Sequence, residues 1–381
     1  MIIAVLVPLA MALDGHGAAY LAWRVPLPGE PLNAANHAER SGPVIVGDDI
    51  LVGAAGGTAL FALSRSDGSL RRQYPAHASV ESSPVVEGSR LWFGDSAGTT
   101  WCYEVLTATP CWKEPHRGGA PVLSAPLIVN DVVIVTDVDD LVVGLGAADG
   151  ALRWRFQPTA PQIREAELTL YARPSAVLIG DQVVVGFSDG SVVGLDPTFG
   201  DEVWTRRVGE GRYPDVVAEA VTVGSDIIVS GFYEPLVAID RGGHTVRWRV
   251  DAGASARVAV VGSGLAAGVL HPGVDGVLRR VAALTGAVTW TWDSGTGGSL
   301  SAPLLTPSGA YVASSSGGLF LIDVDTGAEL WRYVGDEIWT GVTAALAAEG
   351  DQLLVVTNAG YLYSFGLPQR PHKGETQVTA P

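Results

Sequence analysis

The sequence predicts an all-β protein, an eight-bladed β-propeller of four-stranded antiparallel blades that is closed by its N- and C-terminal strands. Two observations carry this prediction. A strand–turn–strand unit ending in Trp recurs every 41–50 residues, and turns containing Gly separate the strands. The composition agrees, because 48 of the 381 residues are Gly, which disfavours helices, while 47% are hydrophobic. The chain is therefore expected to form one domain of repeated blades.

The N-terminal segment is apolar and ends in Ala10-Met11-Ala12, a pattern typical of a secretory signal. The apolar run is too short to cross a bilayer, and it lacks the basic residues that usually precede it. Residues 1–17 are expected to be a degenerate or truncated export signal, with a strand as the alternative. No other stretch is long enough to cross a membrane, so no membrane span is predicted. No cysteine follows the run, so the lipid-attachment motif is missing there.

Each repeat has an apolar strand, a turn and a second strand that carries the Trp, as in residues 318–333, GLFLIDVDTGAELWRY. A further strand pair precedes this unit, as in Ser301-Ala-Pro-Leu-Leu followed by Ala310-Tyr-Val. Four short strands per repeat of this length are typical of a propeller blade. The predicted blades are residues 41–74, 82–114, 124–156, 172–208, 218–250, 257–292, 301–333 and, for the last, 343–367 with 18–27.

The two ends of the chain are predicted to share the last blade. Its sequence stops after Gly360-Tyr-Leu-Tyr-Ser-Phe-Gly366, and a matching Trp-bearing strand lies near the start, around Trp23. Pairing them would remove the open edges of the ring. The domain then spans residues 18–367, and the polar tail 368–381 is expected to be disordered. The repeat tryptophans are expected to pack between blades as core: Trp23, Trp112, Trp154, Trp204, Trp248, Trp290 and Trp331.

Charge and cysteine content narrow the partners and the compartment. The formal net charge is −16, so the chain repels phosphate backbones and no nucleic-acid partner is expected. Cys102 and Cys111 flank a short segment that reads as a hairpin. They form either a disulfide or two free thiols, and a disulfide would indicate an oxidising compartment.

The repeat pattern L-D-x-x-T-G-x-x-x-W resembles that of pyrroloquinoline-quinone-type propellers, and Leu321-Ile-Asp-Val-Asp-Thr-Gly-Ala-Glu-Leu-Trp331 matches it best. The resemblance covers residues 18–367 and, by size and blade number, is greatest to the BamB type of outer-membrane assembly factor. It implies a non-enzymatic, monomeric scaffold that is periplasmic or associated with the outer membrane. The implied partner is a periplasmic protein, the POTRA-type domains of a BamA-like protein.

Two segments resemble the partner-binding motifs of BamB proteins. Glu167-Leu-Thr-Leu-Tyr-Ala-Arg173 lies where that family has L-T-L-R-G, so Leu168, Leu170, Tyr171 and Arg173 become candidate contacts. One blade later, Arg212-Tyr-Pro-Asp-Val-Val217 is similar to R-L-S-D-V-D, which adds Arg212 and Asp215, although Val217 replaces the second acid. Independently of the family, residues 157–173 form the longest inter-blade connection, which either binds a partner or folds onto its own blade.

Other functions find less support in the sequence. The histidines show no metal-ligand spacing, and no catalytic, cofactor-binding or metal-binding residues are predicted. A quinone-binding sensor or dehydrogenase is one alternative. A dehydrogenase resembling this fold would need a vicinal Cys–Cys disulfide, and the chain has no Cys–Cys pair. A propeller that binds a small ligand or carbohydrate is the other alternative. It gains support if the tryptophans outside the repeat positions gather at one mouth of the channel: Trp92, Trp101, Trp292 and Trp339.

Overall fold

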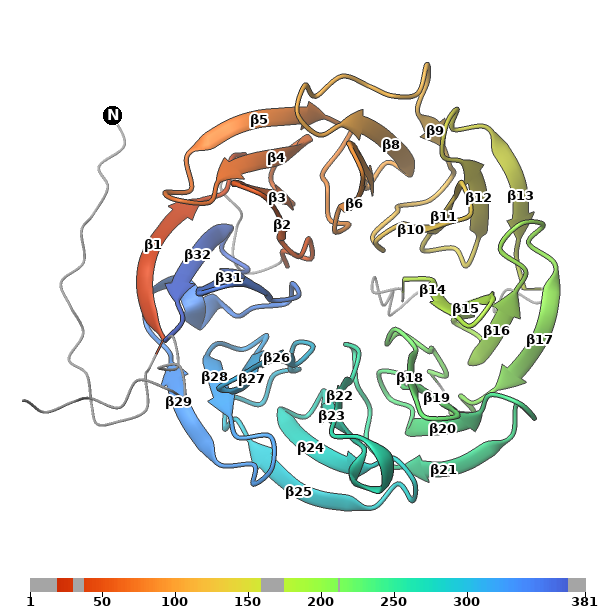
Figure 1. The fold of residues 1–381 in the computed structure, drawn as a ribbon, viewed down its shortest axis with the longest axis vertical. Helices are drawn as coiled ribbons and strands as arrows, with labels where there is room; N and C mark the ends of the chain where they lie inside the picture. Colours follow the sequence, from red (N-terminus) through yellow and green to blue (C-terminus); the bar gives the residue numbers. More distant parts are fainter. Residues whose placement is uncertain (1–18, 30–37, 159–174, 212, 369–381) are drawn as a thin grey trace, which may run out of the picture.

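The computed structural model describes residues 19–29, 38–158, 175–211 and 213–368. These residues form eight four-stranded antiparallel sheets arranged as a ring around a central opening (Figure 1). The predicted export signal and the predicted disordered tail lie outside the described residues, apart from Pro368. The eight-bladed propeller predicted from the sequence is confirmed.

Every blade runs from an inner strand beside the opening to an outer strand at the rim (Figure 1). Blades 1 to 4 contain β2 (Val44–Val46), β3 (Asp49–Gly53), β4 (Ala59–Ser64) and β5 (Leu70–Pro75); β6 (Val85–Glu87), β7 (Arg90–Gly94), β8 (Thr99–Glu104) and β9 (His116–Arg117); β10 (Leu127–Val129), β11 (Val132–Thr136), β12 (Val142–Gly146) and β13 (Leu152–Phe156); and β14 (Val177–Ile179), β15 (Gln182–Gly186), β16 (Ser191–Leu195) and β17 (Glu202–Arg207).

Blades 5 to 8 repeat this plan, and blade 8 takes its outer strand from the N-terminal end. Their strands are β18 (Val221–Val223), β19 (Asp226–Val229), β20 (Leu236–Asp240) and β21 (Val246–Val250); β22 (Ala259–Val261), β23 (Gly268–Pro272), β24 (Val277–Ala282) and β25 (Val288–Asp293); β26 (Leu304–Thr306), β27 (Gly309–Ala313), β28 (Leu319–Ile322) and β29 (Glu329–Tyr333); and β30 (Ala347–Glu349), β31 (Gln352–Val356), β32 (Tyr361–Gly366) and β1 (Tyr20–Pro26). Two short 3₁₀ helices, η1 (Gly264–Ala266) and η2 (Asp336–Thr340), lie in connections.

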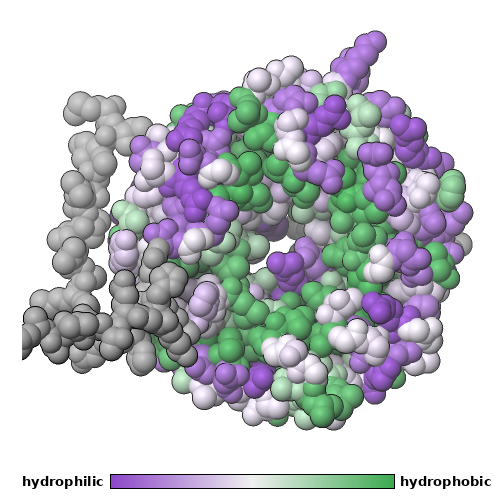
Figure 2. Space-filling model, in the orientation of Figure 1, coloured by the Kyte–Doolittle hydropathy of each residue, from purple (hydrophilic) through white to green (hydrophobic). Residues whose placement is uncertain are grey.

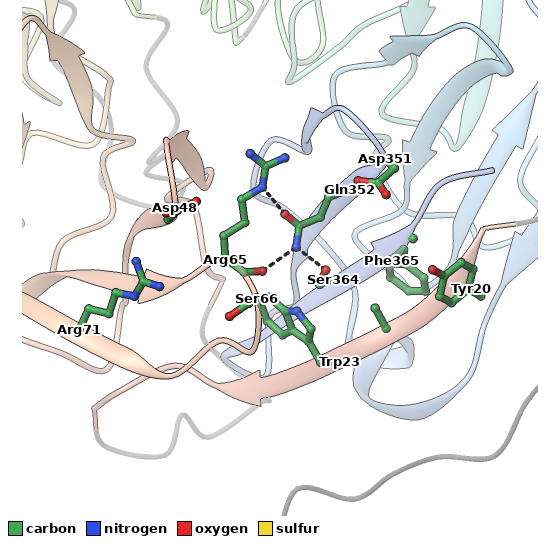
Figure 3. A pocket seen from close by; sticks show the side chains of 12 residues that line it. Tyr20, Trp23, Asp48, Arg65, Ser66, Arg71, Asp351, Gln352, Ser364 and Phe365 are labelled. Atoms are coloured by element: carbon green, nitrogen blue, oxygen red, sulfur yellow. Dashed lines mark hydrogen bonds between the residues drawn. The ribbon is translucent and has the colours of Figure 1, made fainter. Parts of the chain in front are cut away.

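The ring is closed by β1 and β32, which pair antiparallel from Tyr20 opposite Gly366 to Pro26 opposite Tyr361. Blades 8 and 1 line an open pocket of about 520 Å³ at this seam (Figure 3). Side chains of blades 8 and 1 form hydrogen bonds with one another across the seam. The Arg65 guanidinium donates to Gln352 Oε1 at 2.8 Å, and Gln352 Nε2 donates to the Arg65 carbonyl at 3.0 Å and to Ser364 Oγ at 2.7 Å. The pocket is therefore part of the closing joint.

Apolar side chains fill the space between blades. The buried residues form eight clusters, and each cluster draws on two neighbouring blades. Sheets packed face to face in this way bury apolar surface on both sides of every blade, which is the main stabilising contribution in such a fold. The chain has few charged residues because so many of its strand residues are buried between blades.

The repeat tryptophans lie in these interfaces. In five of them the ring covers a turn glycine of the next blade so closely that an added Cβ would come within 3.0 Å of ring atoms: Trp23 over Gly68, Trp112 over Gly150, Trp154 over Gly200, Trp248 over Gly286 and Trp290 over Gly327. In blade 5 that turn position is His244, whose ring stacks on Trp204 with centroids 4.4 Å apart. The indole N–H groups of Trp112, Trp154 and Trp248 donate to carbonyl oxygens of the same neighbouring turns at 2.8–3.1 Å.

Blade 2 departs from the predicted limits. Its outer strand is only His116–Arg117, beyond the predicted end at residue 114, and Trp112 lies in the turn before it. A disulfide joins Cys102 of the third strand to Cys111, with Cα atoms 5.4 Å apart, and Cys111 N donates to Cys102 O at 3.1 Å. The disulfide holds the start of this irregular segment against the third strand, where the backbone pairing between β8 and β9 is short.

His271 lies in the second strand of blade 6, one residue before its end, and is fully buried. Both of its ring nitrogens lack a hydrogen-bond partner among the described residues. Burial lowers the pKa of His271 to about 4, and Arg279 adds to the shift while Asp275 opposes it. The unfolded chain therefore binds a proton near pH 6.5 that the folded chain does not bind until about pH 4, so stability falls as the pH drops through this interval.

Replacing His271 by leucine is expected to move the midpoint of acid unfolding to lower pH, because the proton-linked loss of stability disappears. Fluorescence-monitored acid titration of both proteins would measure the shift. The control is His244→Asn, because Asn tolerates the positive φ of 51° at that turn. His116 is not used for this purpose because its ring is half-buried. An unchanged midpoint in His271→Leu would contradict the assigned protonation.

Candidate protein-binding face

The two faces of the ring carry different loops. Because successive strands run in opposite directions, the loop after the second strand and the connection to the next blade lie on one face, here called the connection face. The remaining hairpin turns lie on the opposite face, here called the turn face. Backbone hydrogen bonds tie the two kinds of loop together on the connection face, for example from Val208 N to Gly190 O at 2.8 Å and from Val216 N to Phe187 O at 3.1 Å.

Most of the predicted partner-binding residues lie outside the described residues, namely Leu168, Leu170, Tyr171, Arg173 and Arg212. The chain on either side of the first group enters and leaves the connection face between blades 3 and 4. Ser175, the first described residue after Pro158, accepts a hydrogen bond from Ala125 N at 3.0 Å. The described residues that flank both sequence-predicted segments therefore lie on one face of the ring.

Asp215 is described, and its side chain is only 5% exposed. The next residue, Val216, pairs with Gly231 in an isolated β-bridge. An added Cβ on Gly231 would meet the Asp215 carbonyl, so the connection between blades 4 and 5 presses closely on the loop of blade 5. Asp215 thus lies buried at the base of this connection.

Glu234 fixes the same connection from the loop of blade 5. Its side chain is 7% exposed, and its carboxylate accepts the backbone N–H groups of Gly211 at 2.7 Å and Glu210 at 3.2 Å. Arg249 adds a hydrogen bond to the Val208 carbonyl at 2.9 Å. Charge-assisted hydrogen bonds of this kind hold residues 208–211 in one conformation next to Arg212.

An exposed aromatic group stands beside this braced segment. Tyr233 is 59% exposed, its ring lies 4.7 Å from that of Phe232 and 5.6 Å from that of Tyr213. Sequence analysis did not identify Tyr233 or Glu234. The available signal was the adjacent aromatic pair Phe232-Tyr233, because the corresponding positions of blades 4 and 8 are Ser188-Asp189 and Asn358-Ala359. A rigid tyrosine with a free edge is a common anchor in protein interfaces.

The central opening has a different character. Hydrophobic residues gather around it on the face seen in Figure 2, and the middle residue of the inner strand is apolar in every blade except blade 5, which has Thr222. Ion pairs between neighbouring blades join Arg40 to Glu81 and, at 3.7 Å, Arg257 to Glu219. Ligand pockets normally combine apolar walls with a few converging polar groups. The charged groups of these two ion pairs already bind each other, so they do not converge on a ligand.

The tryptophans outside the repeat do not gather at one mouth of the channel. Trp92 is buried in blade 2, and Trp101 donates to Asp95 Oδ2 at 2.9 Å in the same blade. Trp292 donates to Glu329 Oε2 at 3.2 Å between blades 6 and 7. Trp101 and Trp292 are half-buried, and Trp339 in η2 is 69% exposed. The arrangement therefore gives no support to a carbohydrate platform built from these four rings.

Comparison with known proteins identifies the family. The family model described as outer membrane protein assembly factor BamB matches residues 16–120, 84–269 and 236–375, which together span nearly the whole chain. The chain belongs to the BamB family. The match extends across all eight blades, including the closing strands, so it concerns the entire ring.

Individual BamB proteins are similar at low identity. The factor from Legionella pneumophila (strain Paris) is 28% identical over 202 residues, which is 51% of each chain, so this match spans about half the length of that relative. The factor from Yersinia pestis is 22% identical over 76% of this chain and 72% of its own. The crystal structure of BamB from Moraxella catarrhalis superposes with a TM-score of 0.75 at 17% identity, covering 92% of this chain and all of that one. The structural likeness concerns the fold.

Quinone enzymes share the fold as well. Quinohemoprotein alcohol dehydrogenase ADHIIG from Pseudomonas putida HK5 superposes with a TM-score of 0.70 at 12% identity, over 94% of this chain and 78% of that enzyme. The residues of this BamB-family chain do not fit a quinone site of that kind. Its two cysteines are nine residues apart and are bonded to each other within blade 2, so they cannot supply a vicinal disulfide.

Metal-binding clusters and membrane-spanning helices are both absent from the part of the chain that the structure describes. No group of three or more His, Cys, Asp or Glu side chains is arranged there to hold a metal ion. Among the same residues, no helix has the length and apolar character needed to span a membrane.

Proposed function

We propose that this chain is a non-enzymatic scaffold of the bacterial cell envelope that binds a partner protein during outer-membrane protein assembly. The observation that carries the proposal is the match to the BamB family across the whole ring. The proposed site of action is the periplasm, in association with the outer membrane, and the Cys102–Cys111 disulfide is in keeping with an oxidising compartment. The chain would act there as a monomer.

The proposed binding site is the connection face of blades 3 to 5. It combines Leu168, Leu170, Tyr171 and Arg173 of one connection with Arg212 and the braced segment 208–211 of the next. Tyr233 supplies an aromatic anchor beside them. The partner inferred from the resemblance is the set of POTRA-type domains of a BamA-like protein. A fixed, partly aromatic surface reduces the entropy lost on binding and so favours this role.

The double substitution Leu168→Asp and Leu170→Asp is expected to abolish capture of those POTRA-type domains in a pull-down, because two buried carboxylates would oppose docking. The matched control is Leu106→Asp with Leu284→Asp. Those leucines are 76% and 65% exposed in hairpin turns on the turn face, so the control adds the same charge elsewhere. Equal capture by both variants would refute the assigned face.

A further inference from the structure

Glu39 occupies a position that two other blades fill with a buried valine. Glu39-Arg-Ser-Gly-Pro43 aligns with Val80-Glu-Ser-Ser-Pro84 and Val122-Leu-Ser-Ala-Pro126 by the shared Ser and Pro. All three residues are buried, with exposed fractions of 1% for Glu39, 0% for Val80 and 3% for Val122. On the connection face between blades 8 and 1, a carboxylate therefore stands where two other blades have a buried apolar side chain.

The neighbouring strand explains why this blade differs. Val80 and Val122 press on Gly53 and Gly94, the glycines that end the second strands of blades 1 and 2. Blade 8 ends its second strand with Val356, which has no such gap. The Glu39 carboxylate is held on the blade 1 side, where Oε2 accepts the Ala55 N–H at 2.9 Å.

The charge of Glu39 is poorly compensated. Burial raises the pKa of Glu39 to about 7, and repulsion from Glu81 adds to the effect, whereas the Ala55 N–H and Arg40 lower it. The Arg40 guanidinium is itself ion-paired with Glu81. Among the described residues, no cationic side chain forms an ion pair with Glu39. A buried carboxylate without a counter-ion is costly, and a cation that reaches it is bound favourably.

A cavity adjoins this carboxylate. Its volume is about 160 Å³, and its lining consists of Glu39 and short segments of blades 8 and 1: residues 26–29, Ala54, Gly56 and residues 359–361. Prolines, Leu27 and Tyr361 give it apolar walls. A planar, weakly hydrated guanidinium suits such walls better than a compact, strongly hydrated ammonium, because it can lie against proline and aromatic surfaces while it donates to a carboxylate.

We propose that this cavity binds a guanidinium group, namely an arginine side chain of a partner protein, with Glu39 as its counter-ion. The site lies at the seam between blades 8 and 1 and is separate from the proposed surface on blades 3 to 5. It would give the ring a second, charge-specific contact on the same connection face.

Calorimetric titration of the full chain with N-methylguanidinium tests this site. Because only ionised Glu39 attracts the probe, the apparent affinity is expected to be about tenfold higher at pH 8 than at pH 6, given the pKa of about 7. Glu39→Gln should weaken binding at least tenfold while it keeps an oxygen for the Ala55 N–H. The peptide acetyl-Gly-Arg-Gly-amide should bind as well, since the proposed ligand is carried on a protein.

The control variant is Asp351→Asn, which alters the larger pocket at the same seam and should leave binding unchanged. Equal binding of neutral N-methylurea, equal affinity at both pH values, or an equal loss in both variants would overturn the proposal. Exclusion of the peptide would overturn the assignment to a partner protein. These outcomes are independent of POTRA capture, so the site and the proposed function can fail separately.

Discussion

Gly200→Ala is expected to destabilise the protein by about 2–5 kcal/mol, a large loss for one methyl group. Gly200 has a φ of +74°, where an L-residue costs roughly 1–2 kcal/mol. Its added Cβ would also enter the ring of Trp154, and overpacking of a closed interface costs about 1–3 kcal/mol. Trp154 cannot retreat, because Gly144 of its own blade lies directly on its other side.

Gly180→Ala separates these two contributions. Gly180 belongs to the same blade and has a φ of +67°, but an added Cβ there meets nothing within 4 Å. It should therefore lose only the backbone contribution of about 1–2 kcal/mol. Denaturant unfolding of both variants measures the difference. Equal losses would mean that the Trp-on-glycine contact does not hold neighbouring blades together.

The second large effect concerns binding. Tyr233→Ala is expected to weaken the affinity for the POTRA-type domains about 30-fold, which corresponds to the ~2 kcal/mol typical of an aromatic anchor. Phe232 and Tyr213 hold the ring in place in the free protein, so little side-chain entropy is lost when a partner covers it. Calorimetric titration of the two proteins measures the change.

Phe199→Ala is the matched control for Tyr233→Ala. Phe199 is 69% exposed in a hairpin turn on the turn face, so the substitution removes an exposed ring of similar size at a distance from the proposed surface. Its affinity should equal that of the unaltered chain. A Tyr233→Ala protein that binds as tightly as this control would remove Tyr233 from the interface.

The ring itself could be predicted because each blade repeats one local pattern. The strand–turn–strand unit recurs in all eight blades and carries its Trp in seven of them, and the unpaired strand around Trp23 indicated how the ring closes. The disulfide was one of two alternatives at the sequence level, since spacing alone does not fix the approach of Cys102 and Cys111. Their pairing depends on the irregular end of blade 2.

The connection face was harder to predict because its loops depart from the repeat. Tyr233 and Glu234 belong to a loop whose role depends on contact with residues 208–211, which no local pattern encodes. Asp215 matched a family motif, yet its burial follows from the close approach of Gly231. The sequence did not predict a role for Glu39, because its alignment with Val80 and Val122 is informative only once all three residues are known to be buried.

Hydrogen–deuterium exchange of the full chain, with and without the POTRA-type domains, tests the central claim most directly. The account predicts that binding protects amides in the three segments assigned to the proposed surface, residues 157–175, 208–217 and 230–235. The hairpin turns around Leu106, Phe199 and Leu284 should exchange as before. Protection confined to those turns, or no protection at saturating partner, would contradict the account.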